Sequence, residues 1–224
     1  MLPMKPCIRH QCQGQRAHWR ASNIAQGAVS RMKSLAASLL FLSICASSME
    51  GQVLYSNGPD TGTIGAWPVN FGQSVSNSFT LEADSIVTDV VLSIWAADDR
   101  NPPQTAKWEI TTEPFGGEVL ASGGSILGLI TYTDGRLYTR WTMEIQNMNA
   151  RLPCGTYYLQ VYDVITAWRT WAFWGESNGI GCTSPGCPST AYFDPALANG
   201  YGLTRPIGSE AFEIIGTAGV PPSW

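Results

Sequence analysis

The densest group of aromatic side chains in the sequence lies at residues 168–176, and its residue types suit the binding of sugars. The group consists of Trp168, Arg169, Trp171, Phe173, Trp174 and Glu176. Aromatic faces offer large apolar surfaces on which sugar rings stack, and guanidinium and carboxylate groups form hydrogen bonds with hydroxyls. The candidate ligand-binding residues are therefore Trp168, Arg169, Trp171, Trp174 and Glu176. The alternative is that the tryptophans pack in a core, because on a strand Trp171 and Phe173 point one way and Trp174 the other.

Two further sets of side chains have the oxygen atoms that metal binding or hydrolysis needs. Asp98, Asp99 and Asn101 share a loop and are candidate calcium ligands, because calcium takes oxygen ligands; the alternative is that they are simply solvated. Calcium is the only cofactor that the sequence suggests. A two-carboxylate glycoside hydrolase needs an acid pair across a cleft. Glu109 and Glu144 lie beside strand tryptophans, but exposed strand faces carry glutamates routinely, so no catalytic residue is nominated.

The histidines and the net charge exclude several classes of function. His10 and His18 both precede an apolar segment that we assign to a signal peptide, so the exported chain has no histidine. This excludes Ser-His-Asp and Cys-His catalysis, histidine-ligated zinc and histidine pH switching. From Gln52 onward, seven Lys and Arg residues stand against sixteen Asp and Glu residues, a formal net charge of −9. A chain this acidic repels phosphate backbones, so nucleic acid is not an expected partner.

The cysteines predict one disulfide. Cys182 and Cys187 bracket Thr-Ser-Pro-Gly, a turn-forming sequence that brings the two Cα atoms within bonding range. Export would place them in an oxidising compartment, where the bond persists and staples a long loop. Cys154 is left over. It is a small buried residue, a nucleophile without a histidine to activate it, or one ligand of a three-thiol metal site whose spacing is not that of a zinc motif.

A secretory signal peptide is the firmest expectation from the N-terminal part of the sequence. Residues 35–46 form an apolar run that is too short to span a bilayer and has the length of a signal-peptide core. Ala46 and Ser48 are small residues at positions −3 and −1 of a cut after Ser48. We therefore assign residues 32–48 to a signal-peptide helix that engages the export machinery, and place the protein outside the cell or at its surface.

The alternatives for this segment are a buried core helix and lipid attachment at Cys45. No amphipathic partner helix follows, which disfavours the first, and Ile44 is too large for a lipoprotein box, which disfavours the second. Residues 1–31 contain basic residues and no acidic ones. They are expected to be a disordered basic extension or a start-site artefact.

Beyond the signal peptide, the pattern is that of short strands separated by Gly, Pro, Asn and Asp. The expected strands are 53–56, 75–81, 86–96, 106–112, 119–122, 126–132, 137–145, 156–164, 170–174 and 211–215. Residues 175–208 are rich in Gly, Pro, Ser and Asn and are expected to be long loops. This pattern predicts a single all-β domain over residues 49–216, an antiparallel two-sheet β-sandwich of the jelly-roll type.

Several segments together resemble those of secreted bacterial proteins of the PEP-CTERM class. The segments are Val53–Pro59, Ser76–Leu81, Trp108–Ile110, Pro114–Gly117, Leu152–Leu159 and Trp174–Gly179. The last residues, 217–224, are similar to the start of the Val-Pro-Glu-Pro sorting motif without its glutamate, and the membrane helix and basic tail of that class do not follow. The resemblance implies a β-sandwich processed by an exosortase, with a truncated sorting tail, and supplies no catalytic residues.

Three hypotheses about function follow from the sequence. The first is a non-catalytic exported protein of the cell surface or extracellular matrix that binds polysaccharide through residues 168–176. The second is a carbohydrate-active enzyme that uses two carboxylates. The third is a purely structural matrix protein. The first is preferred, because no constellation of catalytic residues emerges.

Overall fold

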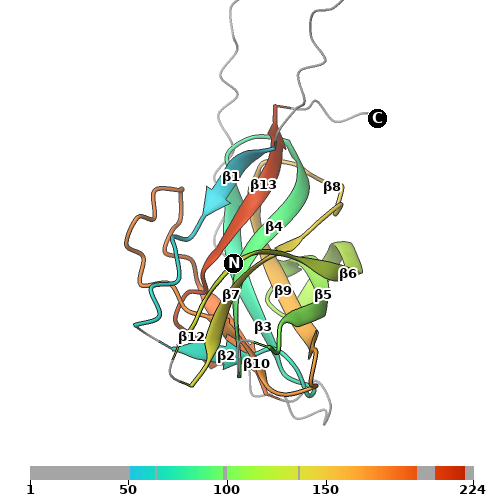
Figure 1. The fold of residues 1–224 in the computed structure, drawn as a ribbon. Helices are drawn as coiled ribbons and strands as arrows, with labels where there is room; N and C mark the ends of the chain where they lie inside the picture. The colour runs from blue at the N-terminus through green and yellow to red at the C-terminus, as the bar shows by residue number, and fades with distance from the viewer. Residues whose placement is uncertain (1–50, 64, 98–99, 136, 196–204, 220–224) are drawn as a thin grey trace, which may run out of the picture. The chain divides into compact units, whose positions relative to one another are not determined.

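The computed structural model describes residues 51–63, 65–97, 100–135, 137–195 and 205–219 (Figure 1). The expected basic extension, the signal peptide and the alternative lipid site at Cys45 lie outside these residues. Asp98, Asp99 and residues 220–224 of the expected sorting motif also lie outside them. The described part of the chain contains no helix, and hence none that is long and apolar enough to cross a membrane.

The described residues form strands joined by turns and loops. These strands are β1 (Gln52–Ser56), β2 (Ala66–Pro68), β3 (Ser74–Leu81), β4 (Ser85–Ala96), β5 (Pro103–Glu113), β6 (Gly116–Thr133), β7 (Thr139–Ile145), β8 (Ala150–Leu152), β9 (Gly155–Thr166), β10 (Ala172–Gly175), β11 (Ala191–Asp194), β12 (Arg205–Ile207) and β13 (Phe212–Ala218).

All strand pairs are antiparallel, and hydrogen bonds join the strands in the order β1-β13-β4-β7-β6-β5-β9-β3-β11-β12. β10 pairs with β4 and β2, and β8 pairs with β4. β6 pairs with β5 up to Ile126 and with β7 from Leu127 onward. Figure 1 shows β6 bending as it passes from one partner to the other. The expected all-β antiparallel class is confirmed, but the strands form one curled sheet, a half-barrel, instead of two clearly separate sheets.

The continuity of β6 explains a difference from the expected strands. Gly123 and Gly124 separate the two strands that the sequence predicts here, yet the pairing with β5 runs through both glycines. A Cβ on Gly123 would lie only 2.9 Å from Cζ2 of Trp108. The glycine therefore leaves space for a tryptophan ring and does not mark a turn.

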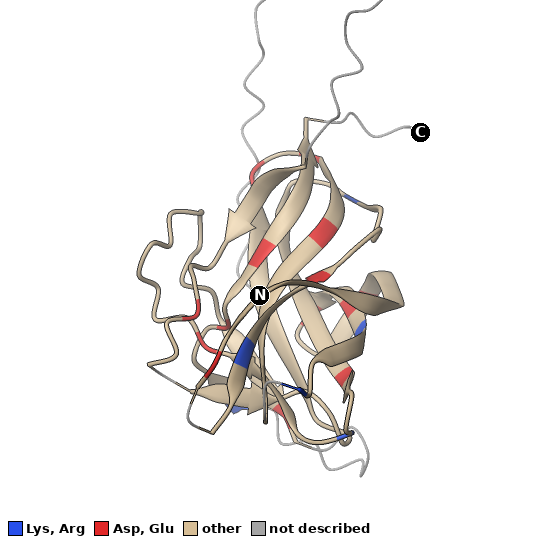
Figure 2. Cartoon of the chain, viewed as in Figure 1, with Lys and Arg blue, Asp and Glu red and all other residues tan. Residues whose placement is uncertain are grey.

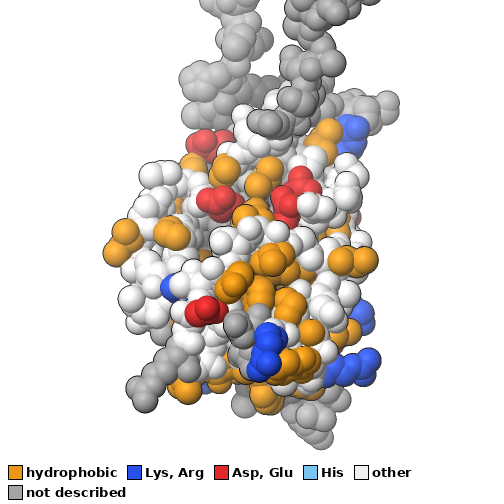
Figure 3. Space-filling view, in the orientation of Figure 1, with side chains coloured by type: hydrophobic (Ala, Val, Ile, Leu, Met, Phe, Trp, Pro, Cys, Tyr) orange, Lys and Arg blue, Asp and Glu red, His pale blue; other side chains and the backbone are white. Residues whose placement is uncertain are grey.

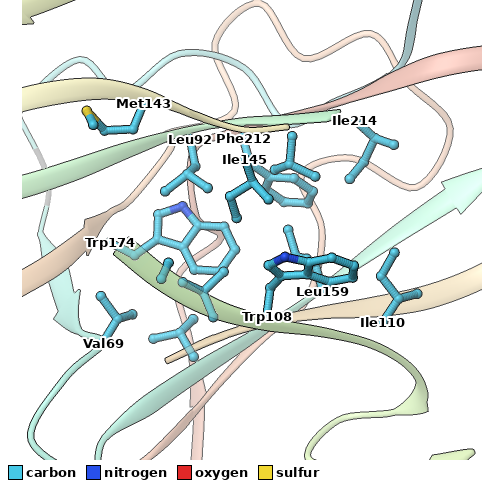
Figure 4. Close-up of a cluster of buried hydrophobic side chains, with 14 of the residues drawn as sticks. Val69, Leu92, Trp108, Ile110, Met143, Ile145, Leu159, Trp174, Phe212 and Ile214 are labelled. Atoms are coloured by element: carbon cyan, nitrogen blue, oxygen red, sulfur yellow. The ribbon is translucent and has the colours of Figure 1, made fainter. Parts of the chain in front are cut away.

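The core lies inside the curl. Figure 4 shows Leu92, Met143 and Phe212 on one side of it, and Trp108 and Leu159 on the other. All five side chains are buried. Leu92, Met143, Phe212, Trp108 and Leu159 lie on β4, β7, β13, β5 and β9 respectively, and each strand contributes one of them from its inward face. The core therefore joins strands distant in sequence.

The short strands at the margins of the sheet were not expected. β2, β8, β11 and β12 have three or four residues each, and β11 and β12 lie in the segment expected to be loops. Pro206 is in β12, an edge strand, where a residue without an N–H donor is tolerated. β13 extends to Ala218, so the first residues of the segment assigned to the sorting motif are part of the sheet.

Candidate functional site

The strand β10 places its neighbouring aromatic residues on opposite sides of the sheet. Trp174 is completely buried, and its indole N–H donates a hydrogen bond to the carbonyl oxygen of Ala211. Phe173 is half-buried and faces the other way, paired across the strands with Trp95 of β4. Trp171, just before β10, is 45% exposed and stacks on Phe173 with ring centroids 6.1 Å apart. The outer face of the sheet is therefore aromatic here.

Five aromatic side chains form an unbroken row on this face, which we call the aromatic row. In order, they are Phe71, Trp171, Phe173, Tyr138 and Trp95. Successive ring centroids lie 4.8, 6.1, 5.4 and 6.4 Å apart. In the space-filling view, hydrophobic side chains gather in the lower half of the face shown, with Lys and Arg side chains beside them (Figure 3). A contiguous exposed apolar surface of this kind is a candidate binding site.

Asp60 holds one end of the row in place. Its Oδ2 accepts hydrogen bonds from the Trp95 indole N–H and from the Ser93 hydroxyl, the latter 2.6 Å away. The Arg140 guanidinium lies 3.9 Å from Oδ1. Gly175 makes room for this carboxylate, because a Cβ there would lie 2.4 Å from Oδ2. The orientation of Trp95 is thus fixed by a charged group with several partners.

A groove of about 620 Å³ adjoins the other end of the row. Phe71, which is 56% exposed, belongs to both the row and the groove wall. Ile126 and Ile165 supply exposed apolar surface, and Arg169 lines the groove as well. The groove lies where β6 leaves β5 for β7, so the bend of the sheet creates it.

The candidate residues of segment 168–176 do not act as one group. Trp171 belongs to the row and Arg169 to the groove. Trp168 is 52% exposed, but its ring contact is with Arg100, 5.6 Å from the ring centroid. Trp174 is in the core and so is not part of the candidate surface.

Glu176 is also turned inward. It is only 9% exposed, and its carboxylate accepts hydrogen bonds from the Trp67 indole N–H at 2.7 Å and from the Gly65 amide at 3.0 Å. Its bridge partner in the sheet is Glu210, which is completely buried, with neither carboxylate oxygen hydrogen-bonded within the described structure. Burial, and then the nearby charges of Glu176 and Asp60, raise the pKa of Glu210 well above its usual value. Both glutamates are thus buried in the sheet and are not part of the aromatic row.

Glu109 and Glu144 lie on different strands, and each has a hydrogen-bond partner. Glu109 is on β5 and Glu144 on β7, with β6 between them. Glu109 accepts a hydrogen bond from the Tyr162 hydroxyl at 2.9 Å. Burial, followed by this hydrogen bond, raises the pKa of Tyr162 to about 12. Glu144 accepts one from the side-chain amide of Gln146.

Residues 175–179 read Gly-Glu-Ser-Asn-Gly, the spacing of the nucleophile elbow of hydrolases. That motif requires a strand-to-helix turn and an exposed serine. Here Ser177 is 6% exposed and its hydroxyl donates to the carbonyl oxygen of Asn57. No helix follows, and the described residues include no histidine that could act as base. The spacing is therefore structural.

The expected disulfide is confirmed: Cys182 and Cys187 are bonded, with their Cα atoms 6.0 Å apart. Cys154 takes no part in it and is half-buried; its backbone N–H donates to the carboxylate of Asp84. No group of three or more His, Cys, Asp or Glu residues that could hold a metal is found among the residues described. Of the candidate calcium ligands, Asn101 is completely buried and its Oδ1 accepts a hydrogen bond from the Trp168 amide.

Sequence reasoning missed Phe71, Trp95, Tyr138 and Asp60. Trp95 had one usable signal, because it alternates with the core residues Ile94 and Ala96 and so faces outward. Phe71 and Tyr138 lie outside strands, and their place in the row depends on the packing of loops. Comparison with known proteins adds no further residues, because the chain matches no protein-family model and no curated protein.

Proposed function

We propose that this protein is an exported, non-catalytic protein that binds polysaccharide at the cell surface or in the extracellular matrix through the aromatic row. The observation that carries this proposal is the unbroken contact of five partly exposed rings on the outer face of the sheet. Such rings offer apolar surface for the faces of successive sugars. The hydrogen bonds of Asp60 keep one end of that surface in a single orientation.

Export is part of the proposal and rests on the expected signal peptide. The disulfide supports it, because such bonds persist in oxidising compartments. Membership of the PEP-CTERM class and exosortase processing are further parts that rest on the sequence resemblance, and a jelly-roll-like sandwich is a further part that rests on the strand pattern. N-terminal sequencing of the secreted protein is expected to begin at Met49; a secreted protein that begins at Met1 would contradict the assignment.

The binding claim is tested with two matched substitutions. Trp171→Ala and Trp168→Ala each remove an exposed indole, but only Trp171 contacts the row. We expect Trp171→Ala to abolish retention on a panel of insoluble and gel-embedded polysaccharides and Trp168→Ala to leave it unchanged. Equal loss in both variants would move the site to the loop at 168–171, and no retention of the native protein on any polymer would favour a purely structural role.

The same panel separates binding from hydrolysis. A non-catalytic role predicts that no reducing ends are released during long incubation. If reducing ends are released by the native protein and by Trp171→Ala but not by Glu176→Gln, the result would favour the enzyme hypothesis.

A further inference from the structure

The groove beside Phe71 has a feature that distinguishes it from the rest of the sheet. Three residues of its wall, Phe71, Asp163 and Arg169, have left-handed backbone conformations, with φ of 55°, 47° and 54°. They are half of the six non-glycine residues with positive φ in the described structure. Each such residue costs on the order of 1 kcal/mol or more, and strain of this kind gathers where side chains must be presented in one orientation.

The β9 strand contributes to this strain through a bulge. Its pairing with β5 shifts register between Thr105 and Lys107, which face Ile165 and Tyr162 respectively. Asp163 and Val164 are therefore accommodated opposite a single residue. Bulges redirect side chains and occur next to binding sites. Here the bulge places Asp163 in an ion pair with Lys107, 2.8 Å away, at the groove wall.

The groove and the row contain three basic side chains, and two of them are paired with the carboxylates of Asp163 and Asp60. Arg140 lies beside Trp95, and Lys107 and Arg169 line the groove. Figure 2 shows most Lys and Arg segments in the lower half of the view, whereas Asp and Glu segments also occupy the upper half. Within the described structure, Lys107 and Arg140 have carboxylate partners but Arg169 has no ion pair. The Lys107–Asp163 pair is exposed, and such pairs contribute about 0–1 kcal/mol, so Lys107 can exchange partners readily.

Resting on the proposed function, we propose that the ligand is an acidic polysaccharide, and that the groove takes one of its sugar units with the anionic group against Arg169. A guanidinium forms two parallel hydrogen bonds with a carboxylate or sulfate, which a neutral hydroxyl does not reproduce. Ile126, Ile165 and Phe71 pack against the apolar face of that sugar. Because Phe71 belongs to both the groove and the aromatic row, a polymer bound in the groove continues onto the row, where the neighbouring sugar units stack on the rings.

The test compares one polymer with and without its charge. Polygalacturonate and its fully methyl-esterified form share a backbone and differ in the carboxylates. We expect the full chain, in affinity electrophoresis, to bind the acid form about tenfold or more tightly than the ester, as for a charge-assisted hydrogen bond. Equal binding of both forms would overturn the assignment. Binding of dextran sulfate is measured in parallel, and its comparison with polygalacturonate distinguishes a preference for sulfate from a preference for carboxylate.

Three variants locate the effect. Arg169→Gly removes the guanidinium and accepts the left-handed backbone without strain, and Arg169→Gln keeps a shorter polar side chain without the charge. Both are expected to reduce binding of the acid form to the level of the ester. Arg151→Gln, on β8 and outside the row and groove, changes net charge by the same amount and is expected to have no effect. A similar loss in Arg151→Gln would mean that only net charge matters, which contradicts the proposal.

The outcomes separate this inference from the proposed function. If Trp171→Ala loses binding to the ester while Arg169→Gly leaves the acid preference intact, the aromatic row stands and the groove assignment fails. If neither polymer binds, and other acidic polymers also fail, both fail. Unchanged thermal unfolding of the Arg169 variants excludes misfolding as the cause.

Discussion

Trp171 and Trp174 are three residues apart, yet they belong to two different regions of the molecule. Trp174 lies in the core among Leu92, Met143 and Phe212 (Figure 4), and Trp171 lies on the outer face in the aromatic row. Two carboxylates also differ: Asp60, whose side chain is only 5% exposed, accepts hydrogen bonds from Trp95 and Ser93, whereas neither oxygen of Glu210 has a hydrogen-bond partner in the described structure. Strand alternation separates the two tryptophans, so that Trp174 packs in the core and Trp171 is exposed on the outer face.

The largest expected effect is that of Trp174→Ala. It leaves a cavity in the core and removes the donor to the Ala211 carbonyl. We expect a loss of about 3–5 kcal/mol in the free energy of unfolding, measured by denaturant titration. A loss below that of Trp171→Ala would contradict the assignment of Trp174 to the core.

The next effect is the pH dependence contributed by Glu210. Burial raises its pKa in the folded protein above the ordinary 4.5, so between these two values the folded state binds more protons than the unfolded state. The contribution of Glu210 to the free energy of unfolding is fully present below pH 4.5. Above pH 4.5 it falls by about 1.4 kcal/mol per pH unit until the pH reaches the pKa of Glu210 in the folded protein.

Glu210→Gln removes this ionisable group, so the free energy of unfolding of the variant is expected to fall less steeply as the pH rises. Denaturant titrations at several pH values should find the variant more stable than the native protein near neutral pH, with the two converging at low pH. Identical pH profiles of the two proteins would contradict the inference that Glu210 is buried with a raised pKa. Glu213→Gln, from the same strand region but hydrogen-bonded to Ser56, is the matched control.

Gly175→Ala tests the outer region with a smaller change. The new methyl would collide with Asp60 Oδ2 and the Trp95 indole nitrogen, 2.4 and 2.6 Å away. Displacing the carboxylate weakens two hydrogen bonds, so we expect a loss of about 1–2 kcal/mol together with weaker polysaccharide binding. Unchanged binding would show that the Trp95 end of the row is dispensable.

The smallest effect on stability is expected for Trp171→Ala. Its ring is half-exposed and packs only on neighbours at the surface. We expect a change of about 0.5 kcal/mol, as for surface substitutions, in thermal unfolding, while polysaccharide binding is lost. A large loss of stability would show that Trp171, like Trp174, is needed for packing, and would contradict the difference between the two tryptophans.

The sequence predicted the long strands well, because their alternation is local. The strands expected at 75–81, 86–96 and 156–164 correspond to β3, β4 and β9 with shifts of one or two residues. It missed β11 and β12, because their backbone hydrogen bonds go to β3 and to each other and leave little trace in a segment rich in Gly and Pro. The disulfide could be predicted since its turn is encoded within six residues.

The candidate site was predicted only in part. Of the candidate ligand-binding residues that the sequence nominated, Trp168, Arg169 and Trp171 are exposed in the structure, whereas Trp174 and Glu176 are buried. The row itself joins residues from separate segments between 71 and 173, and ring contacts across such separations follow from sheet pairing and loop packing.

By itself, the sequence determined the all-β class, most strand positions, the cysteine pair and the absence of histidine residues after residue 18. Each of these depends on local pattern or on composition. The tertiary structure decided that β6 continues through its glycines, that Trp174 and Glu176 turn inward, and that Phe71 joins a groove to an aromatic row. These outcomes depend on which distant strands pair and how the sheet curls, so no local window of the sequence contains them.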